Sequence, residues 1–343
     1  MGLGTYRLIL AYLVVCSHLG INLETHFGVN VDVHLGVAAV VCFYILSGFV
    51  MAALMERHYP TLQAAGSFYL DRALRILPQL WLYLIISFAA LAFNLLPPVD
   101  FVSSCTAGKV VANFLVFPFH FHWINELWRC MPIQQAWSLG VEVMFYGAVP
   151  ILFVFSLRAA AMAASIAFFV LAYLGVIDTE YHGYRWITGT MFMFLCGSYL
   201  FTRQNRLERI VPWLIFAGAL MGLVGTFLFP SLNVPYSRSV LVGMAAAVPA
   251  LYVLGFRSVG KWDTFAGNVS YGVFLNHFLA IWALAGFQLA RGERFVLVAL
   301  LASVAAALSF GLVERPIQMI RRSLRIRKVA AVSAATPSVA LSR

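Results

Sequence analysis

Arg72 and Arg75 lie three residues apart in the stretch SFYLDRALRILP (67–78), and an uncharged segment follows them at once. Side chains at positions i and i+3 share one face of a helix, so both guanidinium groups would point the same way at the end of a membrane span. Arginine binds phosphate oxygens through forked pairs of hydrogen bonds. The pair therefore predicts a seat for a phosphorylated donor, beside the simpler alternative that basic residues only flank a span on its cytoplasmic side.

Three titratable side chains, His18, Glu142 and His277, stand inside long apolar runs. Such groups cost a few kcal/mol in lipid and mark candidate functional sites. His18 follows Arg7 by eleven residues, about 16 Å along a helix, and Glu142 lies about 7 Å below the outer interface at Trp137. At similar depth, His18 and Glu142 would form a base oriented by a carboxylate, which could activate a hydroxyl group. Either histidine could instead only hydrogen-bond to a neighbouring helix.

His120 and His122 form a His-x-His pair that raises the question of a metal site. Two imidazoles are a weak signal, and no third ligand stands at a suitable spacing. The chain has neither a glycine-rich phosphate loop nor a Gly-x-Ser-x-Gly turn. We therefore expect no metal cofactor.

The composition defines the class of protein. Hydrophobic residues make up 62% of the 343 residues and charged residues only 10%, against about 25% in soluble domains. The net charge of +10 comes from basic residues at the ends of apolar runs and in the C-terminal tail, so it indicates membrane topology and not nucleic-acid binding. The chain is predicted to be a polytopic membrane protein.

Ten helices are expected from the apolar runs, and we predict an all-α bundle of about ten transmembrane helices. Sorted by alternate connections, 17 Lys and Arg residues fall on one side and 6 on the other, so both termini are predicted to be cytoplasmic. Residues 1–316 would form the transmembrane domain and residues 317–343 a basic, disordered tail. The expected helices are 7–21, 34–55, 76–97, 138–157, 159–177, 186–202, 211–229, 238–255, 269–289 and 295–313.

The segment 109–123 is apolar but too short to cross, and we interpret it as re-entrant or interfacial at the outer face. Cys105 and Cys130 flank it. In an oxidising compartment they could form a disulfide that holds this loop, and two free thiols are the alternative.

Several short stretches, taken in order, resemble the acyltransferase-3 family of integral membrane O-acyltransferases. The resemblance runs from Tyr6 to Pro316. Each stretch alone is weak evidence for the family, but their common order and spacing together are strong evidence. The stretches are Arg7 with His18, HLGVAAVVCFYILSGF (34–49), DRALRILP (71–78), WSLGVEVMFYGAVP (137–150), SYGVFLNHF (270–278) and VERP (313–316).

The resemblance implies an activity: transfer of an acyl group, most often acetyl, from cytoplasmic acyl-CoA to a hydroxyl of a carbohydrate or glycoconjugate at the outer face of a bacterial inner membrane. Arg7, Arg72 and Arg75 would bind the CoA, and His18 would be catalytic together with Glu142. Some members carry an additional span and an extracytoplasmic hydrolase-like domain that helps to transfer the acyl group. This sequence ends soon after the tenth expected helix, so we expect the chain to act alone or with a separate protein. The expected contacts to the acceptor are Trp137, Ser138, Tyr146 and His277.

Two further expectations concern partners and the competing class of function. Contacts with membrane lipids and possible self-association are expected, but no nucleic acid. A proton-coupled transporter is the alternative, because intramembrane His and Glu also suit proton-coupled export. That class predicts inverted repeats and helices broken by Gly or Pro in matching halves, and neither is evident in the sequence.

Overall fold

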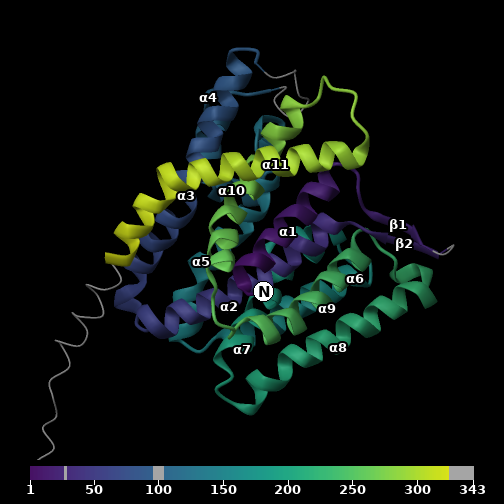
Figure 1. The fold of residues 1–343 in the computed structure, drawn as a ribbon. Coiled ribbons are helices and arrows are strands. Elements are labelled where there is room, and N and C mark those ends of the chain that lie inside the picture. Colours follow the sequence, from purple (N-terminus) through teal and green to yellow (C-terminus); the bar gives the residue numbers. More distant parts are fainter. Residues whose placement is uncertain (27–28, 96–103, 324–343) are drawn as a thin grey trace, which may run out of the picture.

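The computed structural model describes residues 1–26, 29–95 and 104–323, and they form a bundle of helices with one small hairpin (Figure 1). The strands are β1 Leu23–His26 and β2 Val29–Val33, paired antiparallel. The helices are α1 Leu3–His18, α2 Leu35–His58, α3 Ala65–Ala92, α4 Ala107–Leu115, α5 Trp137–Val154, α6 Arg158–Tyr173, α7 Ile187–Thr202, α8 Arg206–Leu228, α9 Ser237–Leu254, α10 Lys261–Ala283 and α11 Arg291–Ser309.

The predicted all-α membrane fold is confirmed. Within the described residues, all helices except the nine-residue α4 correspond one to one to the ten predicted from apolar runs. Six segments are long and apolar enough to cross a membrane by length and composition, and α1 and α6 are shorter apolar helices. The six are Leu35–His58, Leu62–Ala92, Gln134–Val154, Arg206–Leu228, Ser237–Leu254 and Arg291–Ser323.

Helix α2 is the central helix, and it packs against α1, α7 and α9. It is apolar on all sides, as expected of a helix surrounded by others. Two glycines let α2 and α7 approach closely: a Cβ at Gly48 would overlap the carbonyl of Phe194, and a Cβ at Gly197 would overlap the carbonyl of Ile45. Small residues at such a contact bring two helix backbones together in membranes.

The start of α1 is held by a carboxylate from α10. Asp263 accepts hydrogen bonds from the backbone N–H groups of Gly2 (2.8 Å), Gly4 (3.1 Å) and Thr5 (2.9 Å) and from the Thr5 hydroxyl (2.8 Å). These N–H groups have no partner within their own helix, so Asp263 caps α1 from another helix. The cap sets the register of α1 along α10.

The helix boundaries differ from the predictions where charged residues enter the bundle. Helix α3 begins at Ala65 and not at residue 76, so Arg72 and Arg75 lie within it, and Pro78 is inside the helix and does not close it. Helix α10 likewise begins at Lys261 and not at residue 269. Carboxylates in the bundle pair with both arginines of α3, so the helix can continue through them.

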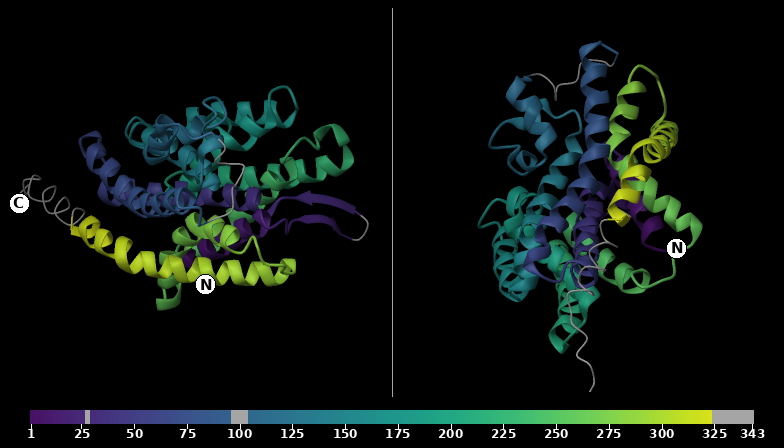
Figure 2. Two further views of the ribbon diagram at one scale, coloured as in Figure 1. Left: turned by 90° about the horizontal axis from the view of Figure 1, so that it is seen from above. Right: turned by 90° about the vertical axis from the view of Figure 1, so that its left-hand side faces the viewer.

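The C-terminal region also differs from the prediction. After α11 the chain makes a π-helical turn at Phe310–Glu314 and stays helical to Ser323. Residues 317–323 are thus helical and not part of a disordered tail. The rest of the predicted tail, 324–343, lies outside the described residues. In Figure 2 the β1–β2 hairpin projects at one end of the molecule and the helix that ends at Ser323 reaches the other.

The segment 109–123, predicted to be re-entrant, covers most of α4 and the short helical turn Phe117–Phe121; two further turns, Leu127–Cys130 and Gln134–Ala136, follow before α5. A nine-residue helix is too short to cross a bilayer. Cys105 and Cys130 form the predicted disulfide across it. The side-chain amide of Asn113 donates to the carbonyls of Lys109 (2.8 Å) and Cys130 (2.7 Å), which ties α4 to the same turn.

Thiol labelling tests both the disulfide and the side of the membrane on which it lies. Cys130 is buried and Cys105 is exposed, so Cys130→Ser should leave Cys105 open to a membrane-impermeant maleimide added outside spheroplasts. Wild-type protein should label there only after reduction, and loss of the bridge should cost roughly 3 kcal/mol of stability. Labelling of unreduced wild type at Cys105, or labelling of the variant only from the cytoplasmic side, would contradict the bridge or the topology respectively.

Candidate active site

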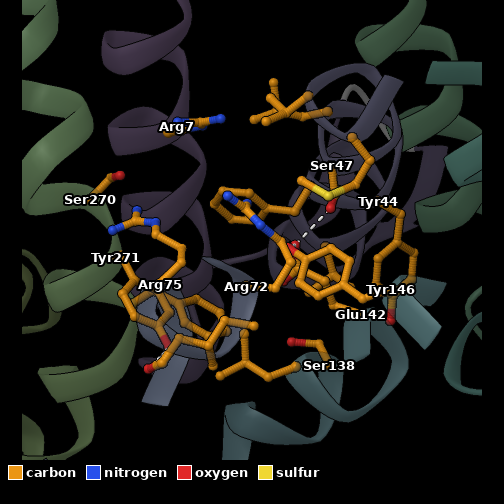
Figure 3. Close-up of a pocket in the computed structure, with 18 of the residues that line it drawn as sticks. Arg7, Tyr44, Ser47, Arg72, Arg75, Ser138, Glu142, Tyr146, Ser270 and Tyr271 are labelled. Atoms are coloured by element: carbon orange, nitrogen blue, oxygen red, sulfur yellow. Dashed lines mark hydrogen bonds between the residues drawn. The ribbon is translucent and has the colours of Figure 1, made fainter. Parts of the chain in front are cut away.

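A cavity of about 280 Å³ opens between α1, α2, α3, α5 and α10 (Figure 3). Its wall brings together residues that lie far apart in the sequence. Of the predicted site residues, the cavity is lined by Arg7, Arg72, Arg75, Ser138, Glu142 and Tyr146. The other polar side chains in the wall are Tyr44, Ser47, Ser270, Tyr271 and Arg321.

Two of the predicted arginines are paired with carboxylates. Arg72 forms an ion pair with Asp71, and Nε of Arg321 donates to the second oxygen of Asp71 at 3.1 Å. Arg75 forms an ion pair with Glu314, which follows α11. These contacts fasten the helix after α11 onto α3. Charges in an apolar interior need such partners, because lipid cannot solvate them.

Arg7 differs from the other arginines of the wall. Its side chain points into the cavity from α1 (Figure 3), and within residues 1–26, 29–95 and 104–323 it makes no ion pair with a carboxylate. The other two arginines lie near aromatic rings. The Arg72 guanidinium is 6.0 Å from the centre of the Tyr146 ring, and the Arg75 guanidinium is 5.2 Å from the centre of the Tyr271 ring. The wall therefore presents clustered guanidinium groups beside aromatic rings, and among the described residues the Arg7 charge has no carboxylate paired with it.

Glu142 is held by two hydroxyl groups and not by a histidine. It accepts a hydrogen bond from Ser47 at 2.7 Å, drawn in Figure 3, and another from Tyr146 one turn along α5. The predicted pairing of Glu142 with His18 is therefore wrong. The prediction placed both groups at a similar depth, but His18 is the last residue of α1, beyond the cavity that Glu142 lines.

His18 is paired with His277 instead. Nδ1 of His18 and Nε2 of His277 are hydrogen-bonded at 2.9 Å, and Nδ1 of His277 lies 3.2 Å from the carbonyl oxygen of Val273. His18 is exposed at the end of α1, whereas the His277 side chain has no exposed area. Both nitrogens of His277 are engaged and its side chain has no exposed area, so the expected contact with a substrate stays a prediction that this arrangement does not favour.

Two other expected substrate contacts, Trp137 and Ser138, begin α5. The Ser138 hydroxyl donates to the carbonyl of Gln135 at 3.0 Å and lies in the cavity wall. Trp137 does not line the cavity. Its ring packs on that of Tyr184 at 5.0 Å and beneath the Arg185 guanidinium at 4.8 Å, so it belongs to an aromatic cluster on the neighbouring α5–α7 side.

The His120–His122 pair shows no sign of a metal site. In the part of the chain that the structure describes, no group of three or more His, Cys, Asp or Glu side chains is placed to hold an ion. His122 donates from Nδ1 to the carbonyl of Phe119 at 2.7 Å. Burial lowers the pKa of both histidines to about 4, so both are neutral at neutral pH and pack among aromatic rings.

Several site residues were not predicted from the sequence: Ser47, Asp71, Tyr271, Glu314 and Arg321. Asp71 adjoins Arg72, and Glu314 lies in the VERP stretch, so both had a local signal. Arg321 stands among the basic residues assigned to a tail and had none. Only the return of the chain after α11 brings it to the cavity.

Comparison with known proteins identifies the family. The sequence model of the acyltransferase-3 family, described as an acyltransferase domain, matches residues 3–314. The chain belongs to the acyltransferase-3 family. It is therefore a multi-pass membrane acyltransferase, and this assignment favours the enzyme over the transporter alternative.

Relatives agree with the assignment. The chain is 32% identical over 200 residues to an uncharacterized protein of Aquifex aeolicus, covering 56% of this chain and 90% of that one. It is 26% identical to the exopolysaccharide production protein ExoZ of Rhizobium meliloti, over 86% of this chain and 92% of ExoZ. It is 25% identical to the putative membrane-bound transacylase BcsY of Komagataeibacter xylinus, over 80% and 74%. No solved structure matches the chain significantly.

A double-mutant cycle tests whether Arg75 and Glu314 depend on each other. Glu314→Gln leaves the Arg75 charge without its carboxylate and should lower the free energy of unfolding by roughly 3 kcal/mol, at the low end for buried pairs because the arginine keeps 22% exposure. Adding Arg75→Gln should recover most of the loss, measured by reversible unfolding in detergent. The control is Glu24→Gln at an exposed carboxylate, and strictly additive losses would contradict the pairing.

Proposed function

We propose that this acyltransferase moves an acyl group, most often acetyl, from cytoplasmic acyl-CoA to a hydroxyl of a carbohydrate or glycoconjugate at the outer face of the bacterial inner membrane. The observation that carries the proposal is the cavity wall with four arginines, Arg7, Arg72, Arg75 and Arg321. Phosphate groups are the ligands best matched to clustered guanidinium groups.

The charges near the cavity favour an anionic ligand. Three carboxylates, Asp71, Glu142 and Glu314, lie in or directly behind the wall, so the four arginines exceed them by one positive charge. Arg7 contributes its guanidinium without a carboxylate partner in the described residues. An acyl-CoA carries negative phosphates at one end and its thioester at the other, and this wall would hold the phosphate end.

The chemistry is assigned to the other end of α1. Eleven residues separate Arg7 from His18, about 16 Å along the helix, and the acyl end of the donor would extend in that direction. The exposed imidazole of His18 would either deprotonate the acceptor hydroxyl or take up the acyl group itself. Glu142, fixed by Ser47 and Tyr146, would remain in the donor cavity and help to position the donor arm.

A carbohydrate acceptor is supported by the relatives. ExoZ is named as a protein of exopolysaccharide production and BcsY as a putative membrane-bound transacylase. By the positive-inside bias, the arginine cavity would lie on the cytoplasmic side, where acyl-CoA is made, and His18 would lie toward the outer side. This separation of donor and acceptor across the membrane suits modification of a surface carbohydrate.

Donor binding is tested by calorimetry of purified protein with acetyl-CoA. Arg7→Gln should weaken binding roughly 10- to 100-fold, since hydrogen bonds to charged groups contribute about 1.5–3 kcal/mol. Arg7 is suited to this test because its loss leaves no buried carboxylate unpaired. The matched control is Arg322→Gln, whose side chain is exposed beside Arg321. Unchanged affinity in Arg7→Gln and in an Arg72→Gln/Arg75→Gln variant would refute the donor site.

Catalysis is tested separately with labelled acetyl-CoA and membranes that contain the surface carbohydrate. His18→Ala should reduce label transfer by roughly 10²-fold or more, within the range of general acid–base catalysis, and should leave acetyl-CoA binding unchanged. His182→Ala is the control, because this histidine bonds Thr188 away from the cavity. Undiminished transfer by a properly inserted His18→Ala variant would rule out its catalytic role.

A further inference from the structure

A chain of two hydrogen bonds runs from a backbone carbonyl through His277 to His18. The Val273 carbonyl lies 3.2 Å from Nδ1 of His277, and Nε2 of His277 lies 2.9 Å from Nδ1 of His18. The three residues come from two helices, since Val273 and His277 are one turn apart on α10 and His18 ends α1. Each bond in this chain limits which nitrogen of the next ring can carry a proton.

The proton positions follow from the partners. A carbonyl oxygen can only accept, so Nδ1 of His277 must donate to Val273. His277 has no exposed area, and a fully buried imidazole without a carboxylate partner stays neutral because lipid-like surroundings disfavour charge. A neutral imidazole that donates at Nδ1 accepts at Nε2. The proton in the bond between the two histidines therefore belongs to Nδ1 of His18.

The geometry of the rings supports a directed hydrogen bond. The ring planes of His18 and His277 are 13° apart and their centroids 5.1 Å apart, while the two bonded nitrogens are only 2.9 Å apart. The nitrogens thus lie on facing edges, and the N–H bond in one ring plane points at the lone pair in the other. Phe278 packs against both rings, 4.7 Å from His18 and 5.1 Å from His277, and restrains their rotation.

We propose that His277 is a positioning residue that fixes the tautomer of His18, so that Nε2 of His18 carries the free lone pair. This inference rests on the proposed function only for its use in catalysis. His277 touches no substrate, because it is buried and both its nitrogens are engaged. The exposed ring of His18 then offers one basic nitrogen to the outer side.

The tautomer suits both forms of acyl transfer. As a base, Nε2 takes the hydroxyl proton while the acceptor oxygen bonds to the acyl carbon and the carbon–sulfur bond of the donor breaks; the proton then passes to the thiolate to give free CoA. As an acyl carrier, Nε2 bonds to the acyl carbon and releases the thiolate, and the acceptor oxygen later displaces Nε2 while its proton goes to the thiolate. In both cases Nδ1–H remains bonded to His277, which supports the positive charge that develops on His18.

The arrangement replaces the carboxylate that usually orients a catalytic histidine. Glu142 is engaged by Ser47 and Tyr146 and takes no part in it. A neutral partner orients His18 without placing an uncompensated negative charge in the outer half of the bundle. The orientation therefore depends on His277 accepting a hydrogen bond, and a side chain that accepts should substitute for it.

The test reads the tautomer directly by nitrogen NMR of protein labelled with ¹⁵N in the histidine rings, without any donor or acceptor. The His18 signals are identified by their loss in His18→Asn. In wild type, Nδ1 of His18 should carry the proton and Nε2 should not. His277→Phe removes the acceptor and should release His18 to a mixture of tautomers, whereas His277→Gln, whose carbonyl can accept, should keep the wild-type pattern.

Acyl transfer provides the second measurement. His277→Phe should lose roughly 10²-fold in turnover with unchanged acetyl-CoA binding, and His277→Gln should recover most of that loss. A proton on Nε2 of wild-type His18, or equal loss of turnover in both variants, would overturn the proposal. Failure of acetyl-CoA to bind would refute the donor site but leave the tautomer result standing, so the two proposals fail separately. If His277→Phe does not fold, the wild-type spectrum and His277→Gln still decide.

Discussion

Charged groups inside a lipid-embedded bundle must find partners within the chain, and this constraint shapes the site more than any other. Lipid does not solvate charge, so an ion buried there without a partner is costly; Arg7, which makes no ion pair in the described residues, faces the cavity instead. Asp71 forms ion pairs with Arg72 and Arg321, and Glu314 forms one with Arg75. Glu142 accepts hydrogen bonds from two hydroxyl groups. These pairs also bind the helix after α11 to α3. The same contacts therefore stabilise the bundle and assemble the cavity wall.

Helix α1 connects the two parts of the site. Asp263 caps its first turn from α10, and His277 of α10 accepts a hydrogen bond at its last residue. With both ends tied to one neighbour, α1 has a defined register, so Arg7 lies in the cavity and His18 at the opposite end. The packing of α1 on α10 therefore sets the distance between the proposed donor site and the proposed reactive nitrogen. Rigid elements hold functional groups more accurately than loops do.

The hydrogen bond between His18 and His277 explains how the buried His277 is stabilised, for which the sequence indicated no partner. A buried imidazole in lipid needs hydrogen bonds at both nitrogens, and His277 obtains them from Val273 and His18. The cost of burying His277 is thereby offset, and the outward nitrogen of His18 is left free. A histidine that is itself inaccessible can thus define how an accessible one reacts.

Composition, periodicity and charge were sufficient to predict the membrane class, ten of the helices and the pair Arg72 and Arg75, and the family resemblance grouped Arg7 with that pair. These properties are local: apolar runs must lie in lipid, and basic residues collect at their cytoplasmic ends. Titratable groups inside apolar runs singled out His18 and Glu142, to which the family resemblance added their expected roles, and the positions of Cys105 and Cys130 around a short segment made a disulfide one of two alternatives. All of these could be inferred because each depends on residues that are near one another or on a simple count.

The pairing of the polar groups was decided only by the tertiary structure. Depth along a helix suggested that His18 meets Glu142, but depth says nothing of which faces turn toward each other. The orientation of α1 and α5 in the bundle turns His18 toward His277 and Glu142 toward Ser47, and each pair forms a hydrogen bond. Arg321, with no local signal, reaches Asp71 across 250 residues. Sequence determines which groups must find partners, whereas the packing of whole helices, which sums many weak apolar contacts, decides which partners they find.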